Sequence, residues 1–351
     1  MRALITGGGG FLGSRIAEML VERGDRVRVF GRSSYPRLER VGVECMVGDI
    51  RDSQAVNQAA RHVDTVFHVA ALAGVWGPRR TFFEINSRGT ANVIQACLLN
   101  RVQKLVYTST PSVVFNGRDI VEGDEELPHA TRFLAAYPAS KSVAEKMVIE
   151  ANGWESVVEE KRLAESEIKQ RHGSTVHRLS TCALRPHLIW GPGDPHLVPR
   201  LIRMVEAGRL KCVGGGANRV SLTYIDNAAR AHLLAADALA PDAANAGQAY
   251  FINDREPVVL WDWINDLFRR LRLPPVKRKL PFRLAYAVGA GLELVYHLSS
   301  RLGEPPMTRF VAEQMAKSHS FSWRKAARDF GYEPLVDNES GLRKLVEALN
   351  K

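Results

Sequence analysis

The sequence has few cysteines, and they do not form the patterns that metal or redox sites need. Its four cysteines lie far apart in a chain of 351 residues: Cys45, Cys97, Cys182 and Cys212. This usage is typical of a reducing cytosolic compartment, so we expect free thiols, no bound metal and a cytoplasmic protein. No stretch that resembles a secretory signal precedes the apolar run at residues 2–6, so we expect the fold to begin there.

The sequence also lacks an internal repeat, a low-complexity segment and an apolar run long enough to span a bilayer. Its most apolar stretch, residues 284–298, is too short to span, and Glu293 interrupts it. We interpret it as a buried or half-buried helix. The alternatives are an interfacial helix with peripheral membrane contact, or the wall of an apolar substrate channel.

The charge is unbalanced toward the positive side, with a net charge of +10 and a dense basic run at residues 269–283, "RRLRLPPVKRKLPFR". Such a run suits nucleic acid, an anionic membrane or an acidic substrate. Because no nucleic-acid motif accompanies it, we expect no nucleic-acid partner and interpret the run as a solvated basic surface.

Short β-branched runs alternate with amphipathic stretches along most of the chain. Strands are expected over residues 2–6, 26–30, 43–47, 64–69, 104–108 and 181–185. Helices are expected over residues 11–23, 88–99, 136–151, 197–207, 222–238, 258–272 and 281–298, with an added surface helix over 155–170. This alternation predicts an α/β fold, a Rossmann-like doubly wound parallel sheet covered on both faces.

The stretch "ITGGGGFLGSR" sets a glycine-rich turn between the first strand and the first helix. Glycine permits a tight turn, a close approach of backbone N–H groups to a pyrophosphate, and close helix–strand packing. The pyrophosphate would lie at the positive end of the helix dipole. We therefore expect Gly7, Gly10, Phe11, Leu12 and Gly13 to bind a dinucleotide.

The end of the second strand indicates which dinucleotide. NAD sites usually carry an acidic residue there to hold the ribose 2′-OH, but this strand ends with Gly31 followed by Arg32 and Ser33. An arginine pairs with a 2′-phosphate through charge-assisted hydrogen bonds, whereas a carboxylate repels it. The sequence therefore predicts NADP(H), held in part by Arg32 and Ser33.

Two further strand ends are candidates for the cofactor site. Asp49 and Ile50 end the third strand, where the carboxylate can accept from the adenine amino group and Ile50 can pack beside the ring. Turn chemistry alone would also explain Asp49. In "HVAALAG", the small residues Ala70, Ala71 and Ala73 would let the backbone lie along the cofactor.

The stretch "AAYPASKS" places Tyr137 and Lys141 one helical turn apart on the same face. Ketone reduction needs a proton donor and a second hydrogen bond at the developing alkoxide. Tyr137 is the predicted donor, Lys141 is predicted to lower its pKa and to bond the nicotinamide ribose, and Thr110 is predicted to hold the carbonyl. Ser109 and Ser112 are alternatives to Thr110.

The motifs "TGGGGFLG", "GDI", "YTST", "YPASK" and "LRPHLIWGPGD" resemble those of the extended short-chain dehydrogenase/reductase family. The resemblance implies the same threonine, tyrosine and lysine roles. It also implies that Pro186, Leu188 and Ile189 pass near the nicotinamide.

This resemblance further implies a Rossmann domain and a smaller, mostly helical C-terminal substrate domain. We assign residues 1–186 to the first, with its sheet completed by parts of 219–252. Residues 187–218 and 253–351 would then form the substrate domain.

Within that family, "AGVWG", "YTSTPSV" and "GEPPMTRFVAEQ" are most similar to bacterial 2-alkyl-3-oxoalkanoate reductases of long-chain olefin biosynthesis. This implies NADPH-dependent reduction of the 3-keto group of a long-chain lipid acid to the 3-hydroxy acid. It also implies a homodimer and contact with other hydrocarbon-biosynthesis enzymes. The alternatives are a 3β-hydroxysteroid or sterol dehydrogenase, and a sugar-nucleotide epimerase or dehydratase in which Arg219 would bind a diphosphate.

Overall fold

The computed structural model describes residues 1–155, 177–298 and 303–350. Its central layer is a seven-stranded sheet in which every neighbouring pair is parallel. The spatial order is β3 (Glu44–Val47), β2 (Arg26–Gly31), β1 (Arg2–Thr6), β4 (Thr65–His68), β5 (Lys104–Thr108), β7 (Ser180–Pro186) and β12 (Gln248–Ile252). The predicted Rossmann-like parallel sheet is therefore confirmed, and β12 adds its last strand.

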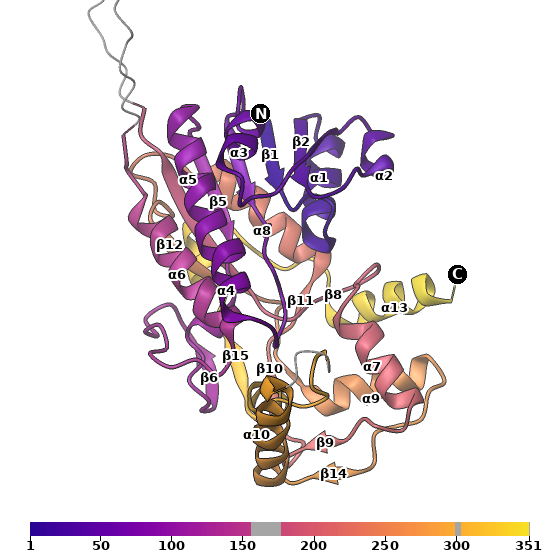
Figure 1. Cartoon of the computed structure of the whole chain (residues 1–351). Coiled ribbons are helices and arrows are strands. Elements are labelled where there is room, and N and C mark those ends of the chain that lie inside the picture. The colour runs from indigo at the N-terminus through magenta and orange to yellow at the C-terminus, as the bar shows by residue number, and fades with distance from the viewer. Residues whose placement is uncertain (156–176, 299–302, 351) are drawn as a thin grey trace, which may run out of the picture.

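Helices cover both faces of this sheet (Figure 1). The strands direct alternate residues to opposite sides, so that Ala3 and Ile5 join one apolar cluster and Leu4 joins the other. The first cluster is shared with α1 (Phe11–Glu22) and α8 (Ile225–Ala238). The second is shared with α3 (Ser53–Ala59), α5 (Gly89–Leu99) and α6 (Ala136–Glu150).

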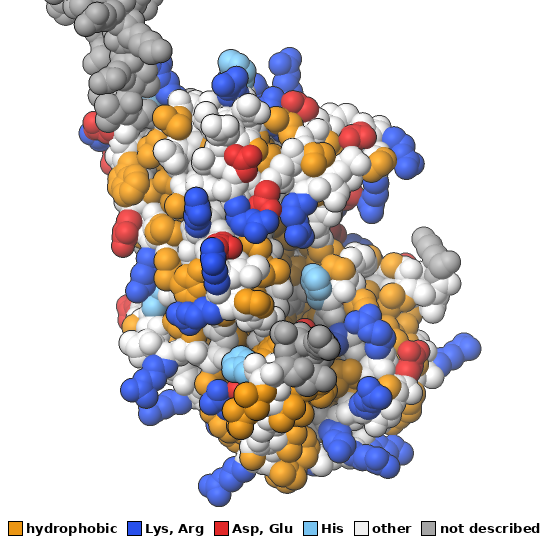
Figure 2. Space-filling view, in the orientation of Figure 1, with side chains coloured by type: hydrophobic (Ala, Val, Ile, Leu, Met, Phe, Trp, Pro, Cys, Tyr) orange, Lys and Arg blue, Asp and Glu red, His pale blue; other side chains and the backbone are white. Residues whose placement is uncertain are grey.

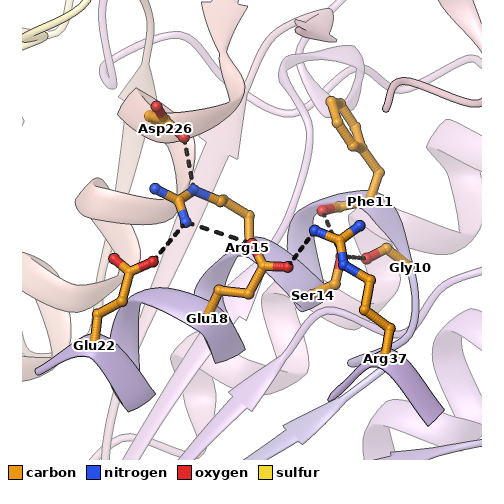
Figure 3. Close-up of polar contacts among 8 residues, drawn as sticks. All are labelled: Gly10, Phe11, Ser14, Arg15, Glu18, Glu22, Arg37 and Asp226. Carbon is orange, nitrogen blue, oxygen red and sulfur yellow. Dashed lines mark hydrogen bonds and ion pairs between the residues drawn. The ribbon is translucent and has the colours of Figure 1, made fainter. Parts of the chain in front are cut away.

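Ion pairs fix α1 against the start of α8 and against the short helix α2 (Pro36–Glu39) (Figure 3). The Arg15 Nε donates to Asp226 at 2.7 Å, and its Nη1 lies 3.2 Å from Glu22. Glu18 accepts from Arg37 at 2.8 Å. Because α1 begins at the glycine turn, these contacts help to hold that turn in place.

A second, small sheet that the sequence did not predict joins three strands of the C-terminal part to one strand from the first half of the chain. Its order is β13 (Val258–Val259), β10 (Arg219–Val220), β15 (His319–Phe321) and β6 (Ile120–Gly123). The remaining elements of this part are mostly helices: α7 (Leu197–Glu206), α9 (Leu260–Arg270), α10 (Phe282–Leu298), α11 (Arg309–Ala316), α12 (Arg324–Phe330) and α13 (Asn338–Leu349). None of the helices in the described ranges is both long and apolar enough to cross a membrane.

Three predicted helices begin at least two residues away from the expected position. The helix predicted over 88–99 continues an earlier helical segment, α4 (Arg79–Phe82) and a π-helical turn at Phe83–Arg88. Those predicted over 222–238 and 258–272 begin later, because short strands occupy their first residues, β11 (Thr223–Tyr224) and β13. Of the helix predicted over 155–170, only Glu155 lies within the described residues.

Candidate active site

A cavity of about 850 Å³ lies at the carboxyl ends of the central strands, between the sheet and the C-terminal helices. This is where open parallel sheets bind their ligands. Among the predicted site residues, Ser33 is exposed outside the cavity. The others line it: Gly7, Gly10, Phe11, Leu12, Gly13, Arg32, Asp49, Ile50, Ala70, Ala71, Ala73, Thr110, Tyr137, Lys141, Pro186, Leu188 and Ile189. The structure brings these side chains together, while their individual roles stay predictions.

The glycine turn is packed so closely that side chains would not fit. Gly7 has a φ of 71°, and a Cβ built there would lie 2.8 Å from the Ala70 backbone. A Cβ at Gly13 would lie 2.3 Å from the Gly7 carbonyl oxygen. Gly10 is the N-cap residue of α1 and has no side chain that could accept from the first N–H groups of the helix. These N–H groups are therefore available to a ligand. This geometry fits the pyrophosphate of a dinucleotide.

Asp49 is held by a partner that the sequence analysis did not consider. Arg51 donates from Nε and Nη2 to both carboxylate oxygens, at 3.0 and 2.7 Å, and these hydrogen bonds lower the pKa of Asp49. Ile50 lies against Gly89, where a Cβ would come within 2.7 Å of its Cδ1. Asp49 is therefore a charged, fixed group at the cavity wall.

Tyr35 is a cavity residue that the sequence analysis missed. Its ring lies across two glycines: a Cβ at Gly9 would be 1.8 Å from its Cε1, and a Cβ at Gly31 would be 2.2 Å from its hydroxyl oxygen. Gly31 holds the position at which NAD enzymes usually carry an acid. The Tyr35 hydroxyl therefore occupies the space that this acidic side chain would need, beside Arg32.

Lys141 and Thr110 come from α6 and from the segment after β5. Lys141 is almost fully buried, and its Nζ donates to the Thr108 carbonyl at 2.6 Å and lies 4.1 Å from the centre of the Tyr107 ring. The Thr110 hydroxyl, also buried, lies near the Tyr137 hydroxyl, whose pKa it lowers, and donates to Ser112 at 3.3 Å.

Burial dominates the acid–base properties of this pair. It raises the pKa of Tyr137 to about 12, with the Thr110 hydrogen bond opposing the shift. It lowers the pKa of Lys141 to about 7, with the charge of Glu145 opposing that shift. Burial, and not Lys141, dominates the pKa of Tyr137 in this structure, so the expected lowering of that pKa by Lys141 is not seen.

A buried charged cluster supports Lys141 from the next turn of α6. Glu145 accepts from Arg185 at 2.6 and 3.0 Å and from His129 Nε2 at 2.7 Å. His129 Nδ1 is then left to accept from Ser142 at 2.8 Å. These hydrogen bonds and the Arg185 charge outweigh the burial of Glu145 and lower its pKa to about 2.

Beyond these groups the cavity is mainly apolar, and three C-terminal helices form its wall: α7, α9 and α11. Their lining side chains include Leu197, Leu201, Met204, Leu260, Trp263, Ile264, Phe310, Val311 and Met315. No residue of α10 lines it, so the proposal that residues 284–298 form the channel wall is wrong. The inner face of α10 packs on α11 instead.

Two further lining residues, His187 and His319, form a buried pair that the sequence analysis did not single out. His187 Nε2 lies 2.6 Å from His319 Nδ1, and His319 Nε2 donates to the Gln314 carbonyl at 2.8 Å. The neighbouring Leu188 has a φ of 42°, an unusual conformation for a branched residue. Strain of this kind is often retained at ligand sites.

The fold is shared with nucleotide-sugar enzymes solved with NAD. A dTDP-glucose 4,6-dehydratase from Streptomyces venezuelae has a TM-score of 0.72 and 22% identity, over 100% of this chain and 97% of that one. A UDP-glucuronic acid 4-epimerase from Bacillus cereus has a TM-score of 0.68 and 19% identity, over 100% and 99%. Those two structures hold NAD, and the likeness shows that this chain shares their fold.

Closer relatives are named as oxidoreductases. The chain is 46% identical to the 2-alkyl-3-oxoalkanoate reductase of Stenotrophomonas maltophilia, over 98% of each chain. It is 35% identical to the 3-beta-hydroxysteroid dehydrogenase of Mycolicibacterium neoaurum, over 97% of this chain and 89% of that one. Residues 4–282 match the 3-beta hydroxysteroid dehydrogenase/isomerase family. The chain belongs to this family, as its motifs predicted, and is an enzyme of the oxidoreductase type.

Proposed function

We propose that this enzyme uses NADPH to reduce the 3-keto group of a long-chain 2-alkyl-3-oxoalkanoate to the 3-hydroxy acid, a step toward olefin hydrocarbons. The observation that carries the proposal is one continuous cavity in which Tyr137, Lys141 and Thr110 separate a glycine-rich dinucleotide turn from an apolar pocket. The name of the relatives that are 46% identical supports this choice of substrate.

The chain's own residues supply the proton for this reduction. A phenol with a pKa of about 12 is protonated at neutral pH, so Tyr137 holds the proton that the developing alkoxide requires. Thr110, which lines the cavity with Tyr137, donates the second hydrogen bond to the ketone oxygen. Lys141, whose pKa is about 7, is the group from which the phenolate regains a proton. A bound NADPH supplies the hydride.

The NADPH preference rests on the second strand end. Gly31 has no carboxylate to repel a 2′-phosphate, and the Arg32 guanidinium at the cavity wall can donate to it. The Tyr35 hydroxyl, which blocks an acidic side chain at position 31, adds a further hydrogen-bonding group there.

The apolar lining of the pocket favours a lipid chain over a sugar nucleotide as the substrate. Its walls are mainly Leu, Ile, Met, Phe and Trp side chains. Arg219, the candidate diphosphate ligand, does not line the cavity, and its Nη2 lies 3.3 Å from the Pro257 carbonyl oxygen. A 3β-hydroxysteroid or sterol remains the second candidate, because relatives at 33–35% identity are named for such activities.

The test is to offer the purified enzyme NADPH with a long-chain 2-alkyl-3-oxo acid, a 3-ketosteroid or a UDP-sugar. We expect nicotinamide oxidation with the oxo acid and formation of the 3-hydroxy acid. Turnover of the steroid alone would transfer the assignment to the second candidate, and turnover of the UDP-sugar alone would reject both.

A further inference from the structure

The outer face of α10 is apolar although it faces solvent. Four of its side chains are between 43% and 65% exposed: Leu284, Val288, Leu294 and Val295. They recur at helical spacing, with the exposed Ala287 and Gly291 between them, and form one continuous stripe. Figure 2 shows hydrophobic side chains gathered over α10. Single exposed apolar side chains are ordinary, but a stripe that follows a whole helix indicates a contact surface.

The opposite face of α10 explains why the helix is fixed in this orientation. Ala285, Gly289 and Glu293 are its buried positions. Gly289 permits close packing, since a Cβ there would lie 2.7 Å from the Thr308 carbonyl carbon. Glu293 accepts from the backbone N–H of Arg309 and from its Nε, each at 2.7 Å. Because this buried carboxylate of α10 binds the start of α11, the opposite face of α10, with its leucines and valines, is turned toward solvent.

Positive charge borders the apolar stripe. The residues before α10 include the exposed Lys277, Arg278 and Lys279, and Arg283 is exposed in its first turn. Within the ranges that the structure describes, none of these four has an acidic partner within ion-pair distance. The single acidic residue of α10, Glu293, is buried. Figure 2 shows Lys and Arg side chains at the margins of the hydrophobic area over α10.

The far end of α10 reaches the rim of the cavity. His297 stacks on Trp76, with ring centroids 4.6 Å apart. Trp76 belongs to the loop in which Gly74 and Val75 line the cavity. On its inner side α10 packs on α11, whose Phe310, Val311 and Met315 line the cavity. A surface that engages α10 would therefore lie close to the wall of the apolar cavity.

We propose that the outer face of α10 and the basic residues Lys277, Arg278, Lys279 and Arg283 dock this enzyme on an anionic lipid surface. An apolar stripe bordered by lysine and arginine matches the acyl–headgroup boundary of such a bilayer. The same unbalanced positive charge disfavours a second copy of α10, because two copies would bring like charges together. The idea that docking serves to collect a lipid substrate rests on the proposed function. The docking itself does not depend on that function.

The test is sedimentation of the full-length enzyme with vesicles of phosphatidylcholine alone or mixed with phosphatidylglycerol. We expect binding only to the anionic vesicles and its loss at high salt. The pair Leu284→Ser and Val295→Ser should weaken binding at least roughly tenfold, as should Lys277→Glu with Arg283→Glu. Matched controls at exposed positions on other elements, Leu335→Ser with Leu349→Ser and Arg26→Glu with Arg118→Glu, should bind like the unmodified enzyme.

Two measurements separate this proposal from its competitors. If the unmodified enzyme ignores anionic vesicles, or binds neutral ones equally well, the docking surface is rejected. If the serine variants change the molar mass in solution while vesicle binding persists, the stripe is instead an interface between copies. Turnover of a short-chain, water-soluble 2-alkyl-3-oxo acid should be unchanged in the variants. Failure of the unmodified enzyme to reduce any 2-alkyl-3-oxo acid, long-chain or short-chain, would reject the proposed function and leave vesicle binding as an independent result.

Discussion

The hydroxyl oxygen of Tyr35 lies where a side chain at Gly31 would begin, 2.2 Å from the Cβ that any other residue would place there. The two positions are therefore coupled, although three residues separate them in the sequence. An acidic residue at position 31, the usual device for NAD, cannot be accommodated while Tyr35 keeps its position.

This coupling predicts how cofactor preference can be changed. Gly31→Asp alone should weaken NADP⁺ binding without creating strong NAD⁺ binding, because the new carboxylate collides with Tyr35. Gly31→Asp combined with Tyr35→Ala should bind NAD⁺ better than either single variant does. Calorimetric titration with each dinucleotide measures both affinities. Strong NAD⁺ binding by Gly31→Asp alone would contradict the coupling.

Arg32→Asp should move the preference from NADP(H) toward NAD(H). Loss of a charge-assisted hydrogen bond costs about 1.5–3 kcal/mol, so NADP⁺ affinity should fall by roughly 10- to 100-fold. Arg26→Asp, the same change at the other end of β2, is the matched control and should leave both affinities unaltered. Unchanged binding of both dinucleotides to Arg32→Asp would show that Arg32 takes no part.

Tyr137→Phe removes the proposed proton donor and preserves the ring. We expect kcat to fall by roughly 100-fold or more, the usual contribution of a positioned acid, while NADP⁺ binding measured by calorimetry stays within a few-fold. Tyr296→Phe, a change on α10 outside the cavity, should retain full activity. An undiminished rate in Tyr137→Phe would reject the tyrosine mechanism.

The long elements and the glycine turn could be predicted from sequence because each carries a local signal. The parallel strands β1, β2 and β5 are buried runs, and α6 begins at the predicted residue. The second sheet could not be predicted, because β10 and β13 are two residues long and show no alternation. Tyr35 was missed for a related reason: a loop, whose path no periodicity reveals, brings its ring over Gly9.

The helix α10 is half-buried, as one interpretation of its apolar sequence expected, but the sequence did not indicate which face is buried. Leu284 and Leu294 face solvent, whereas Glu293 is buried. The reason is a tertiary contact, the pairing of Glu293 with Arg309 at 2.7 Å, which joins residues on different helices. A single sequence does not indicate that partner, so the orientation of α10 was not predictable.

Glu145→Gln should change the pH dependence of reduction. The Glu145 charge raises the pKa of Lys141 against burial, so its removal should lower that pKa further below about 7. If the ammonium form of Lys141 is the active one, the rate falls as pH rises through this pKa. We therefore expect the midpoint of the fall to move to lower pH, by about one unit.

The control for this experiment is Glu150→Gln, an exposed position at the end of α6, whose pH profile should match that of the unmodified enzyme. Because Glu145→Gln leaves Arg185 buried without its partner, it should also lower stability by about 3–5 kcal/mol. Thermal unfolding measures this cost separately. An unstable variant with an unshifted pH profile would give Glu145 a purely structural role.

Met307→Trp tests whether the apolar pocket holds the lipid chain. Met307 lines the cavity and is half-buried, so a larger side chain should fill part of the pocket with little disturbance of the core. Burial of one methylene is worth about 0.8 kcal/mol, so each methylene displaced should lower kcat/KM about fourfold. We expect the loss to grow with substrate chain length and to be absent for short chains. Leu335→Trp, at an exposed position outside the cavity, is the control. Equal losses of kcat/KM for short-chain and long-chain substrates would show that the lipid chain binds outside this pocket.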